Sequence, residues 1–472
     1  MTMNKELTPE SNTLIPYIAE LRALFNGRVV GPNDAGYDKA RAVFYGGIDR
    51  RPAAVIYAAD VADVARAIAL VRDSGLELAV RGGGHSLAGH SATEGGILLD
   101  MTGFKEIDID VEGRTAWAGA GLTAAEYTNA AGAYGLATGF GDTGDVGIGG
   151  LTLGGGIGLL VRKYGLTIDD LLAAEIATAD GQLLTTSADS HPDLFWAIRG
   201  GGGNFGVVTR FRFRLHEVDQ VVGGMLILPA TAQTIASFVA LAKDAPDALS
   251  TIANIMIAPP MPFLPPESHG HPIMMLLMVY AGDAAEGEQV IAPIRALAPP
   301  LADMVRPMPY PEIYRFSEGG PSPVEDVTRA VFLDTVDRSL AEEIITRLRA
   351  STAQMSIAQL RVLGGAMARV PVEATAFAHR HRPMMAAVVA LYEDAAQAPT
   401  HEVWADGLAA VLRQGPPGVY INFVGDKDPE GVRAAYPGAT WERLAAVKAR
   451  YDPDNLFRHN YNIPPVGATN GQ

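Results

Sequence analysis

The chain has 472 residues, of which 48% are hydrophobic and 19% are charged, so we expect a globular protein with buried cores in two or three domains. Its net charge of −16 argues against non-specific binding to nucleic acid or to an anionic membrane. The absence of cysteine excludes disulfides, thiolate metal sites, iron–sulfur clusters and cysteine nucleophiles, and it is consistent with a cytoplasmic location.

No segment of the sequence has the character of a membrane anchor. The N-terminal residues 1–10 are polar and lack the apolar core of a signal peptide. The most apolar run, 146–161, is short and rich in glycine. We therefore expect a soluble protein without membrane contact. The glycines concentrate between Gly82 and Gly206, which indicates an N-terminal half whose backbone wraps around a ligand.

The first elements form a strand, a helix and a second strand. A helix over 15–25 is expected in the N-terminal lead-in, followed by a strand over 54–57. Asp60 can cap the next helix, whose apolar positions repeat at helical spacing until Gly75 ends it. The strand over 76–80 then leads directly into the glycine turn at 82–84.

Later elements alternate between strands and helices. Asp180-Gly181 is a strong hairpin turn between two of the strands. Glycine becomes scarce and proline frequent after about residue 216, so a domain boundary is expected at 216–222. The expected strands are 96–100, 115–118, 171–179, 182–186, 207–215 and 274–280, and the expected helices are 123–134, 192–198, 341–350 and 441–450.

The turn Gly82-Gly83-Gly84-His85-Ser86 is the first candidate site. Glycines allow the backbone to approach a ligand closely, and successive free N–H groups in such a turn bind anions such as phosphate. Two further glycine-rich loops, 147–158 and 200–206, carry apolar residues between their glycines. Together the three loops suit a flat, partly apolar ligand with a phosphate tail, such as a dinucleotide with a three-ring head.

Other patterns predict different chemistry. Gly119 to Ala124 fits G-x-G-x-x-A, the fingerprint of a nicotinamide dinucleotide fold, but its acidic partner would be Asp142 in a glycine-rich loop. Ser86 is close to a nucleophile elbow, yet no helix starts there. The histidine pairs 269/271 and 379/381 lack the companions of a known metal motif, so no metal site is expected.

These loops resemble those of a known family. The run 81–86, the run 146–156, the segment 162–169, the segment 193–206 and the C-terminal segments 451–457 and 460–465 together are similar to FAD-linked oxidases like berberine bridge enzyme, in the flavoprotein superfamily of vanillyl-alcohol oxidase. The resemblance covers about 47–216 and 420–465. The middle of the chain resembles the family only loosely, through 375–380.

The resemblance implies an α+β fold. A FAD-binding domain of the PCMH type, with two subdomains, would be joined to a substrate domain whose mixed or antiparallel sheet is covered by helices. The expected limits are 1–46 for the lead-in, 47–216 for the FAD-binding domain and 217–423 for the substrate-binding domain. Residues 424–472 would then complete the FAD-binding domain.

The resemblance also implies the mode of flavin attachment. In the family, the histidine at the position of His85 is bonded to the 8α-methyl of the flavin ring, and many members add a cysteine at the position of Thr143. Without cysteine, this chain is expected to carry FAD through His85 alone. Such a singly attached flavin should have a lower potential and a less tightly fixed ring.

The family likeness further assigns site residues. The pyrophosphate would lie over Gly82 to Ser86, Gly147 and Gly150, the adenosine end beside Gly206 and Val208, and the ring system under Tyr461 and Asn462. The small Val146 beside the flavin favours an oxidase over a dehydrogenase. The expected cofactor-binding set is Arg81, Gly82, Gly83, Gly84, His85, Ser86, Thr143, Val146, Gly147, Gly150, Gly155, Gly156, Gly206, Val208, Tyr461 and Asn462.

The expected reaction is hydride transfer from an organic substrate to FAD, followed by reoxidation by O2 to give H2O2. Tyr420, in a tyrosine–x–asparagine segment, is the first candidate for the base, and His379 is the second. A flavin dehydrogenase that uses another acceptor, a nicotinamide-dependent reductase and a non-catalytic flavin carrier stay open as alternatives. Family members act on sugars, alkaloids, polyketides and phenolic or secondary alcohols, and the sequence does not select among these. The oligomeric state is also not predicted.

Overall fold

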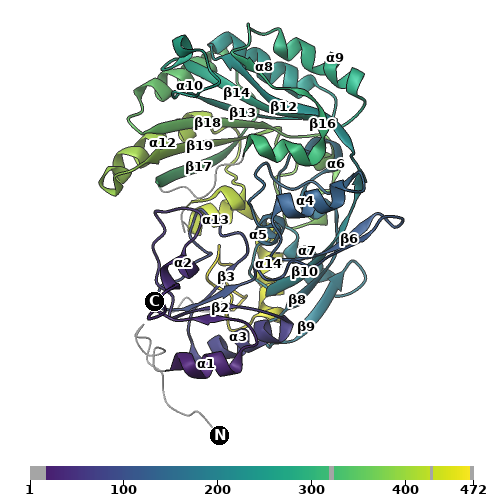
Figure 1. The fold of residues 1–472 in the computed structure, drawn as a ribbon, viewed down its shortest axis with the longest axis vertical. Coiled ribbons are helices and arrows are strands. Elements are labelled where there is room, and N and C mark those ends of the chain that lie inside the picture. Colours follow the sequence, from purple (N-terminus) through teal and green to yellow (C-terminus); the bar gives the residue numbers. More distant parts are fainter. Residues whose placement is uncertain (1–16, 318–323, 426–428, 468–472) are drawn as a thin grey trace.

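The computed structural model describes residues 17–317, 324–425 and 429–467. The molecule has two halves (Figure 1). One is a large antiparallel sheet with helices on its outer face, and the other consists of smaller sheets and short helices and contains both the N-terminal and the C-terminal segments. The expected α+β class is confirmed.

The N-terminal sheet is built from β1 (Val29–Val30), β2 (Ala54–Tyr57), β3 (Leu78–Arg81) and β4 (Ile97–Asp100), in the order β1-β2-β4-β3. Strand β4 pairs in parallel with β2 and β3. The connecting helix α3 (Val61–Ser74) starts where Asp60 accepts from the backbone of Asp63 at 2.9 Å, and Gly75 at φ 71° ends it. The predicted strand–helix–strand unit is confirmed.

Two short helices precede this unit. Helix α1 (Ile18–Leu24) lies within the expected 15–25, whose first two residues are outside the described ranges, and α2 (Tyr37–Arg41) follows β1.

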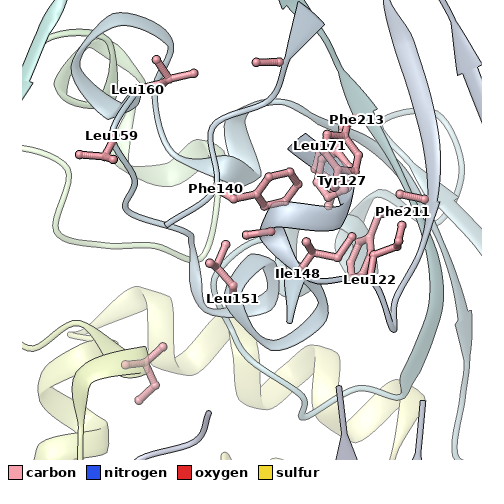
Figure 2. Close-up of a cluster of buried hydrophobic side chains, with 14 of the residues drawn as sticks. Leu122, Tyr127, Phe140, Ile148, Leu151, Leu159, Leu160, Leu171, Phe211 and Phe213 are labelled. Carbon is pink, nitrogen blue, oxygen red and sulfur yellow. The ribbon is translucent and has the colours of Figure 1, made fainter. Parts of the chain in front are cut away.

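An antiparallel five-stranded sheet forms the second part of this half. Its order is β5 (Ile107–Asp110), β6 (Thr115–Gly119), β10 (Val207–Arg214), β8 (Leu171–Ala177) and β9 (Leu183–Ser187). Gly181, at φ 83°, makes the predicted hairpin turn between β8 and β9. Aromatic rings from this sheet and its neighbours meet edge to face, for example Tyr127 with Phe140 at 4.7 Å and Phe140 with Phe213 at 5.3 Å (Figure 2).

Short elements connect the strands of this half: α4 (Ala124–Gly132), β7 (Leu136–Ala137), α5 (Ile148–Gly154), α6 (Val161–Tyr164), η2 (Thr167–Asp169), α7 (Pro192–Ile198) and β11 (His216–Glu217).

The eight-stranded sheet contains residues from 220 to 392, and its neighbouring strands pair antiparallel. The path of seven strands is β15 (Ala302–Asp303), β12 (Gln220–Pro229), β14 (Pro272–Tyr280), β13 (Leu249–Ile257), β18 (Met355–Val362), β19 (Met384–Tyr392) and β17 (Glu325–Leu333), and β16 (Arg306–Pro309) also pairs with β12. Helices α8 (Ala232–Asp244), α9 (Ala284–Arg295), α10 (Arg338–Ala350) and α12 (Ala398–Leu412) cover the outer face (Figure 1).

Alternation along β18 decides what each face of this sheet presents. Ala358, Leu360 and Val362 are buried in the core beneath the helices. Gln359 and Arg361, one position out of phase, point to the opposite face, toward the other half of the molecule. The sheet thus turns polar side chains toward the N-terminal half.

The C-terminal segment packs back onto the N-terminal half. In α14 (Ala439–Tyr451), the fully buried Lys448 donates to Asn204 O at 2.7 Å, Asp452 Oδ2 at 2.6 Å and Phe457 O at 2.9 Å. The other elements after β16 are η4 (Tyr310–Phe316), α11 (Ala366–Arg369), η5 (Val372–Ala374), η6 (Ala395–Gln397), η7 (Ile421–Phe423) and α13 (Pro429–Ala435), and η3 (Pro266–Ser268) precedes β14.

A buried ion pair joins the two halves directly. Arg380 is fully buried and donates twice to Asp169, with both distances at 2.7 Å, and a further hydrogen bond reaches Thr375. The segment 375–380, which resembles the family, therefore supplies both Arg380 and Thr375 to the contact between the two halves. Within the described ranges, every helix is too short or too polar to cross a bilayer.

Candidate functional site

A cavity of about 490 Å³ lies where the N-terminal sheet, the five-stranded sheet, the eight-stranded sheet and the C-terminal segment meet. Its walls include the turn at 82–86, the loop around 141–153, the loop 202–208, residues 420–423 and residues 457–461. A volume of this size is typical of a cofactor or substrate site.

The first two glycine loops touch each other in one wall of this cavity. A Cβ added at Gly83 would lie 2.3 Å from the backbone nitrogen of Gly147, and a Cβ added at Gly147 would lie 2.3 Å from the nitrogen of Gly83. No side chain fits at either position. Both positions therefore require glycine because the two backbones approach each other closely, whether or not a ligand is bound.

The glycine turn leaves its backbone donors free. In the described part of the chain, no N–H group of residues 82–86 donates a hydrogen bond. Gly84 has φ +74°, a left-handed conformation that favours glycine. Free N–H groups in such a turn are an anion-binding nest, so this wall can hold a phosphate.

His85 follows the nest and has one nitrogen without a partner. Its Nδ1 lies 2.9 Å from Gly83 O, and since a carbonyl only accepts, Nδ1 carries the proton. The buried Nε2 has no hydrogen-bond partner within the described ranges. Burial lowers the pKa of His85, against the smaller effects of the Gly83 carbonyl and Asp145. The ring is therefore neutral near pH 7, with a lone pair on Nε2.

The ring of Phe44 holds this imidazole in place. The two rings stack with centroids 4.1 Å apart and an interplanar angle of 26°. Arg81 fixes the chain before Phe44, because its guanidinium donates to Ala40 O at 2.6 Å and Ala42 O at 3.0 Å while paired with buried Asp100 at 2.6 Å. Arg81 itself does not line the cavity, so its place is behind the site.

Residues from the C-terminal segment close another wall. Tyr461 lines the cavity, and its hydroxyl donates to Val424 O. His459 lines the cavity too, with Nε2 bonded to Ala92 O at 2.7 Å. Asn204, from the third glycine loop, donates to Tyr461 O at 3.2 Å and accepts from Ile463 N at 3.0 Å. The third loop and the C-terminal segment thus form one wall.

Tyr420 lines the cavity and contacts the second glycine loop. Its hydroxyl oxygen accepts from Gly156 N at 3.0 Å, Ile157 N at 3.3 Å and Asn422 Nδ2 at 3.0 Å. Burial raises the pKa of Tyr420, and these three donors and the charge of Arg361 oppose that effect. The raised pKa means that Tyr420 is a neutral phenol near pH 7, and the three donors would stabilise a negative charge that develops on its oxygen.

The sheet contributes polar side chains beside Tyr420. Arg361 is only 3% exposed, and its Nη2 donates to Asp142 at 2.9 Å. Its Nε donates to Gln359 at 2.8 Å, and Gln359 donates in turn to Asn254 at 2.9 Å. Arg361, Gln359 and Asp142 all line the cavity.

Most residues predicted for the cofactor lie together in the cavity wall: Gly82, Gly83, Gly84, His85, Ser86, Thr143, Val146, Gly147, Gly150, Gly206, Val208 and Tyr461. Four others, Arg81, Gly155, Gly156 and Asn462, are outside it. Gly156 lies behind the wall, where its N–H donates to Tyr420.

The two candidate bases occupy different places. Tyr420 lines the cavity, whereas His379 does not. His379 is buried between Phe332 and the C-terminal segment, where its Nε2 lies 2.9 Å from Ala434 O, and burial lowers its pKa to about 4. This position suits packing between segments, so Tyr420 is the candidate that the geometry favours.

The structure also explains the fingerprint at 119–124. A Cβ at Gly119 would lie 2.3 Å from Phe104 O, and one at Gly121 would lie 2.0 Å from Met101 O. The glycines are therefore required by packing against the segment 101–104, and a nicotinamide cofactor is not needed to explain them.

Several wall residues were not predicted from the sequence: Phe44, Tyr45, His90, Asp142, Asn204, Gln359, Arg361, Asn422, Phe423, Tyr436, His459 and Asn460. For Gln359 and Arg361, a signal was present, because these two polar residues share one face of a mostly apolar strand. Phe44 and Tyr45 lie in a loop without such a pattern.

Comparison with known proteins identifies two regions of the chain. The family model described as a FAD binding domain matches residues 52–187, and the model described as berberine and berberine like matches residues 419–464. The chain is 32% identical to (R)-6-hydroxynicotine oxidase of Paenarthrobacter nicotinovorans, over 94% of this chain and 97% of the relative. It is 30% identical to an uncharacterized FAD-linked oxidoreductase of Bacillus subtilis, over 93% and 97% of the two chains.

Solved structures share the fold over almost the whole length. 6-Hydroxy-D-nicotine oxidase from Arthrobacter nicotinovorans superposes with a TM-score of 0.84 at 28% identity, covering 93% of this chain and 98% of its own. BBE-like 1 of Physcomitrella patens superposes with a TM-score of 0.84 at 23% identity, covering 96% and 100%, and so supports the fold alone.

Proposed function

The chain belongs to the FAD-linked oxidoreductases like berberine bridge enzyme, and from this we propose that it is an oxidase with FAD attached through His85 alone. FAD, when bound, supplies the acceptor for a hydride from a substrate C–H bond and passes the electrons to O2 to give H2O2. The observation that carries the proposal is the buried His85 Nε2, which has no partner in the described chain and adjoins five free backbone N–H groups.

The cavity residues fit this cofactor. The nest at 82–86 would hold the pyrophosphate, with Gly147 and Gly150 facing it from the second loop. An added Cβ at Gly150 meets no atom within 4 Å, so this glycine leaves open space on the cavity side. Gly206 and Val208 would bind the adenosine end, and Tyr461 would lie against the ring system.

Tyr420 is proposed to accept the proton that the substrate loses with the hydride. Its oxygen is buried and held by three donors, which lower the cost of a negative charge there. Asn422 orients this oxygen and is itself fixed, since the same Nδ2 also donates to Leu151 O at 3.0 Å. The substrate would therefore lie in the part of the cavity that Tyr420 lines.

The attachment is tested by denaturing the purified protein with acid and separating polypeptide from supernatant. We expect the yellow colour to stay with the polypeptide of the native chain and to be released from His85→Ala. His271→Ala is a matched control, because His271 is an exposed histidine outside the cavity. Release of all flavin from the native chain, or retention by His85→Ala, would contradict attachment through His85.

The reaction is tested by anaerobic bleaching with sugars, alkaloids, polyketides and phenolic or secondary alcohols. A compound that bleaches the flavin should, on admission of air, consume O2 and produce an equal amount of H2O2. The half-buried Val146 in the wall supports oxygen as acceptor. Bleaching that is reversed by an artificial dye but not by air would instead establish a dehydrogenase.

A further inference from the structure

The substrate end of the cavity contains a chain of hydrogen bonds with one direction. Arg361 can only donate, so Gln359 must turn its carbonyl oxygen toward Arg361 and its amide nitrogen toward Asn254. Asn254 accepts with its own carbonyl oxygen, which leaves its amide group as a donor. The guanidinium thus fixes the orientation of both amides on the sheet face.

Donors remain after this chain is satisfied. The Nη1 of Arg361 has no hydrogen-bond partner in the described residues, although the side chain is only 4% exposed. Arg361 is also the one Lys or Arg among the cavity-lining residues that the structure describes. A buried cation with free N–H groups favours an oxyanion, because the charge interaction is weakly screened there.

Asp142 holds the guanidinium without filling its remaining donors. It approaches from the N-terminal half, and its backbone oxygen accepts from Ser317 at 2.5 Å, which fixes the loop. The guanidinium lies over the ring of Phe423, 4.9 Å from the ring centroid, and Phe423 stacks with Tyr420 at 5.5 Å. Arg361 is thus held on two sides and set beside the aromatic wall that contains the proposed base.

We propose that Arg361 binds an oxyanion of the substrate, a carboxylate, phenolate or enolate, on a compound whose flat apolar part lies against Phe423. This inference rests on the proposed function, because it names the substrate class of the same site. The oxyanion would be anchored at the sheet, and the C–H bond to be oxidised would lie between it and Tyr420. Arg361 is then a specificity-determining residue that binds substrate.

The test uses three ligands of one size and different charge: benzoate, benzamide and benzylammonium. Each is titrated calorimetrically into the FAD-containing protein under anaerobic conditions. We expect the native chain to bind benzoate at least tenfold more tightly than the other two. Arg361→Met should weaken benzoate binding at least tenfold and change benzamide binding little, and Arg361→Lys should recover part of the loss.

Two further variants keep the result interpretable. Asp142→Asn combined with Arg361→Met removes both charges of the pair, so it avoids an unpaired, half-buried carboxylate should the single variant fold poorly. Arg329→Met, which removes a positive charge paired with Asp406 outside the cavity, should bind benzoate like the native chain. The double variant should lose the preference for benzoate.

Native benzoate affinity in a folded Arg361 variant, or a native preference for benzylammonium, would overturn the proposal. Failure of the proposed function would look different, as a protein without visible flavin absorbance or one whose flavin no substrate bleaches. Since calorimetry reports ligand binding and absorbance reports flavin, the two failures are measured separately.

Discussion

Replacing Tyr420 with phenylalanine removes one oxygen and leaves three donors without their acceptor. The N–H groups of Gly156 and Ile157 are fixed by the backbone and buried, so they cannot turn to water. An unsatisfied buried donor costs about 1–3 kcal/mol. Asn422 can keep its bond to Leu151 O, so its loss is smaller. We expect Tyr420→Phe to lower the free energy of unfolding by roughly 2–6 kcal/mol from the two backbone groups.

The same change should also slow the chemical step. Loss of a general base typically reduces a rate about 10²–10⁴-fold. The assay is anaerobic stopped-flow reduction of the flavin by a substrate found in the bleaching screen, with the midpoint of thermal unfolding measured on the same preparation. Reduction should slow at saturating substrate while the flavin stays bound.

Tyr127→Phe is the matched control for this variant. Tyr127 is also fully buried, and its hydroxyl pairs with Thr138 at 3.0 Å, but it does not line the cavity. It should lose some stability and keep the native rate of flavin reduction. An unchanged rate in Tyr420→Phe would refute the role as base. An unchanged unfolding midpoint would refute the expected loss of stability from the two unsatisfied backbone N–H groups.

Three other predictions concern single side chains. Burial lowers the pKa of His379 from 6.5 to about 4, so its contribution to stability is present above pH 6.5 and is lost as the pH falls toward 4. His379→Gln should therefore reduce the fall of the unfolding midpoint at acid pH, whereas His381→Gln, at an exposed histidine, should not. An unchanged pH profile in His379→Gln would contradict this prediction. Phe44→Leu removes the ring stacked on His85, an interaction of about 0.5–1.5 kcal/mol, and should lower the fraction of flavin that survives acid precipitation; a native fraction would show that the stack is dispensable. Lys448→Met breaks a fully buried ion pair, which costs about 3–5 kcal/mol, and should lower the unfolding midpoint and the FAD content. Native values for both would show that Lys448 does not stabilise the C-terminal wall of the cavity.

Local patterns in the sequence predicted most of the elements around the cofactor. Asp60 and Gly75 mark the two ends of α3, and the turn at Gly181 separates β8 from β9, because capping and turn geometry depend on a few adjacent residues. The strand 107–110 was missed, since its alternating Ile107-Asp-Ile-Asp110 has only two apolar residues and one exposed face.

Contacts between distant segments were not predictable in the same way. The sequence predicts Arg81 as part of the cofactor-binding run, yet its guanidinium donates to Asp100 and to the backbone before Phe44. Arg361 meets Asp142 across more than two hundred residues of chain, and no local spacing encodes that meeting. Family resemblance supplied the role proposed for His85, but the stacking of Phe44 on it becomes visible only when the two loops are placed in space.

The hydrogen bonds of Lys448 connect the C-terminal segment, which is synthesised last, to the third glycine loop. Lys448 reaches back to Asn204 and also fixes Phe457, so the wall that carries Tyr461 is anchored by residues made last. A nascent chain that ends before this segment has all three glycine loops and His85 but lacks one side of the cavity. We therefore expect a chain truncated before this segment to hold FAD less tightly than the full chain, because one side of its cavity is open.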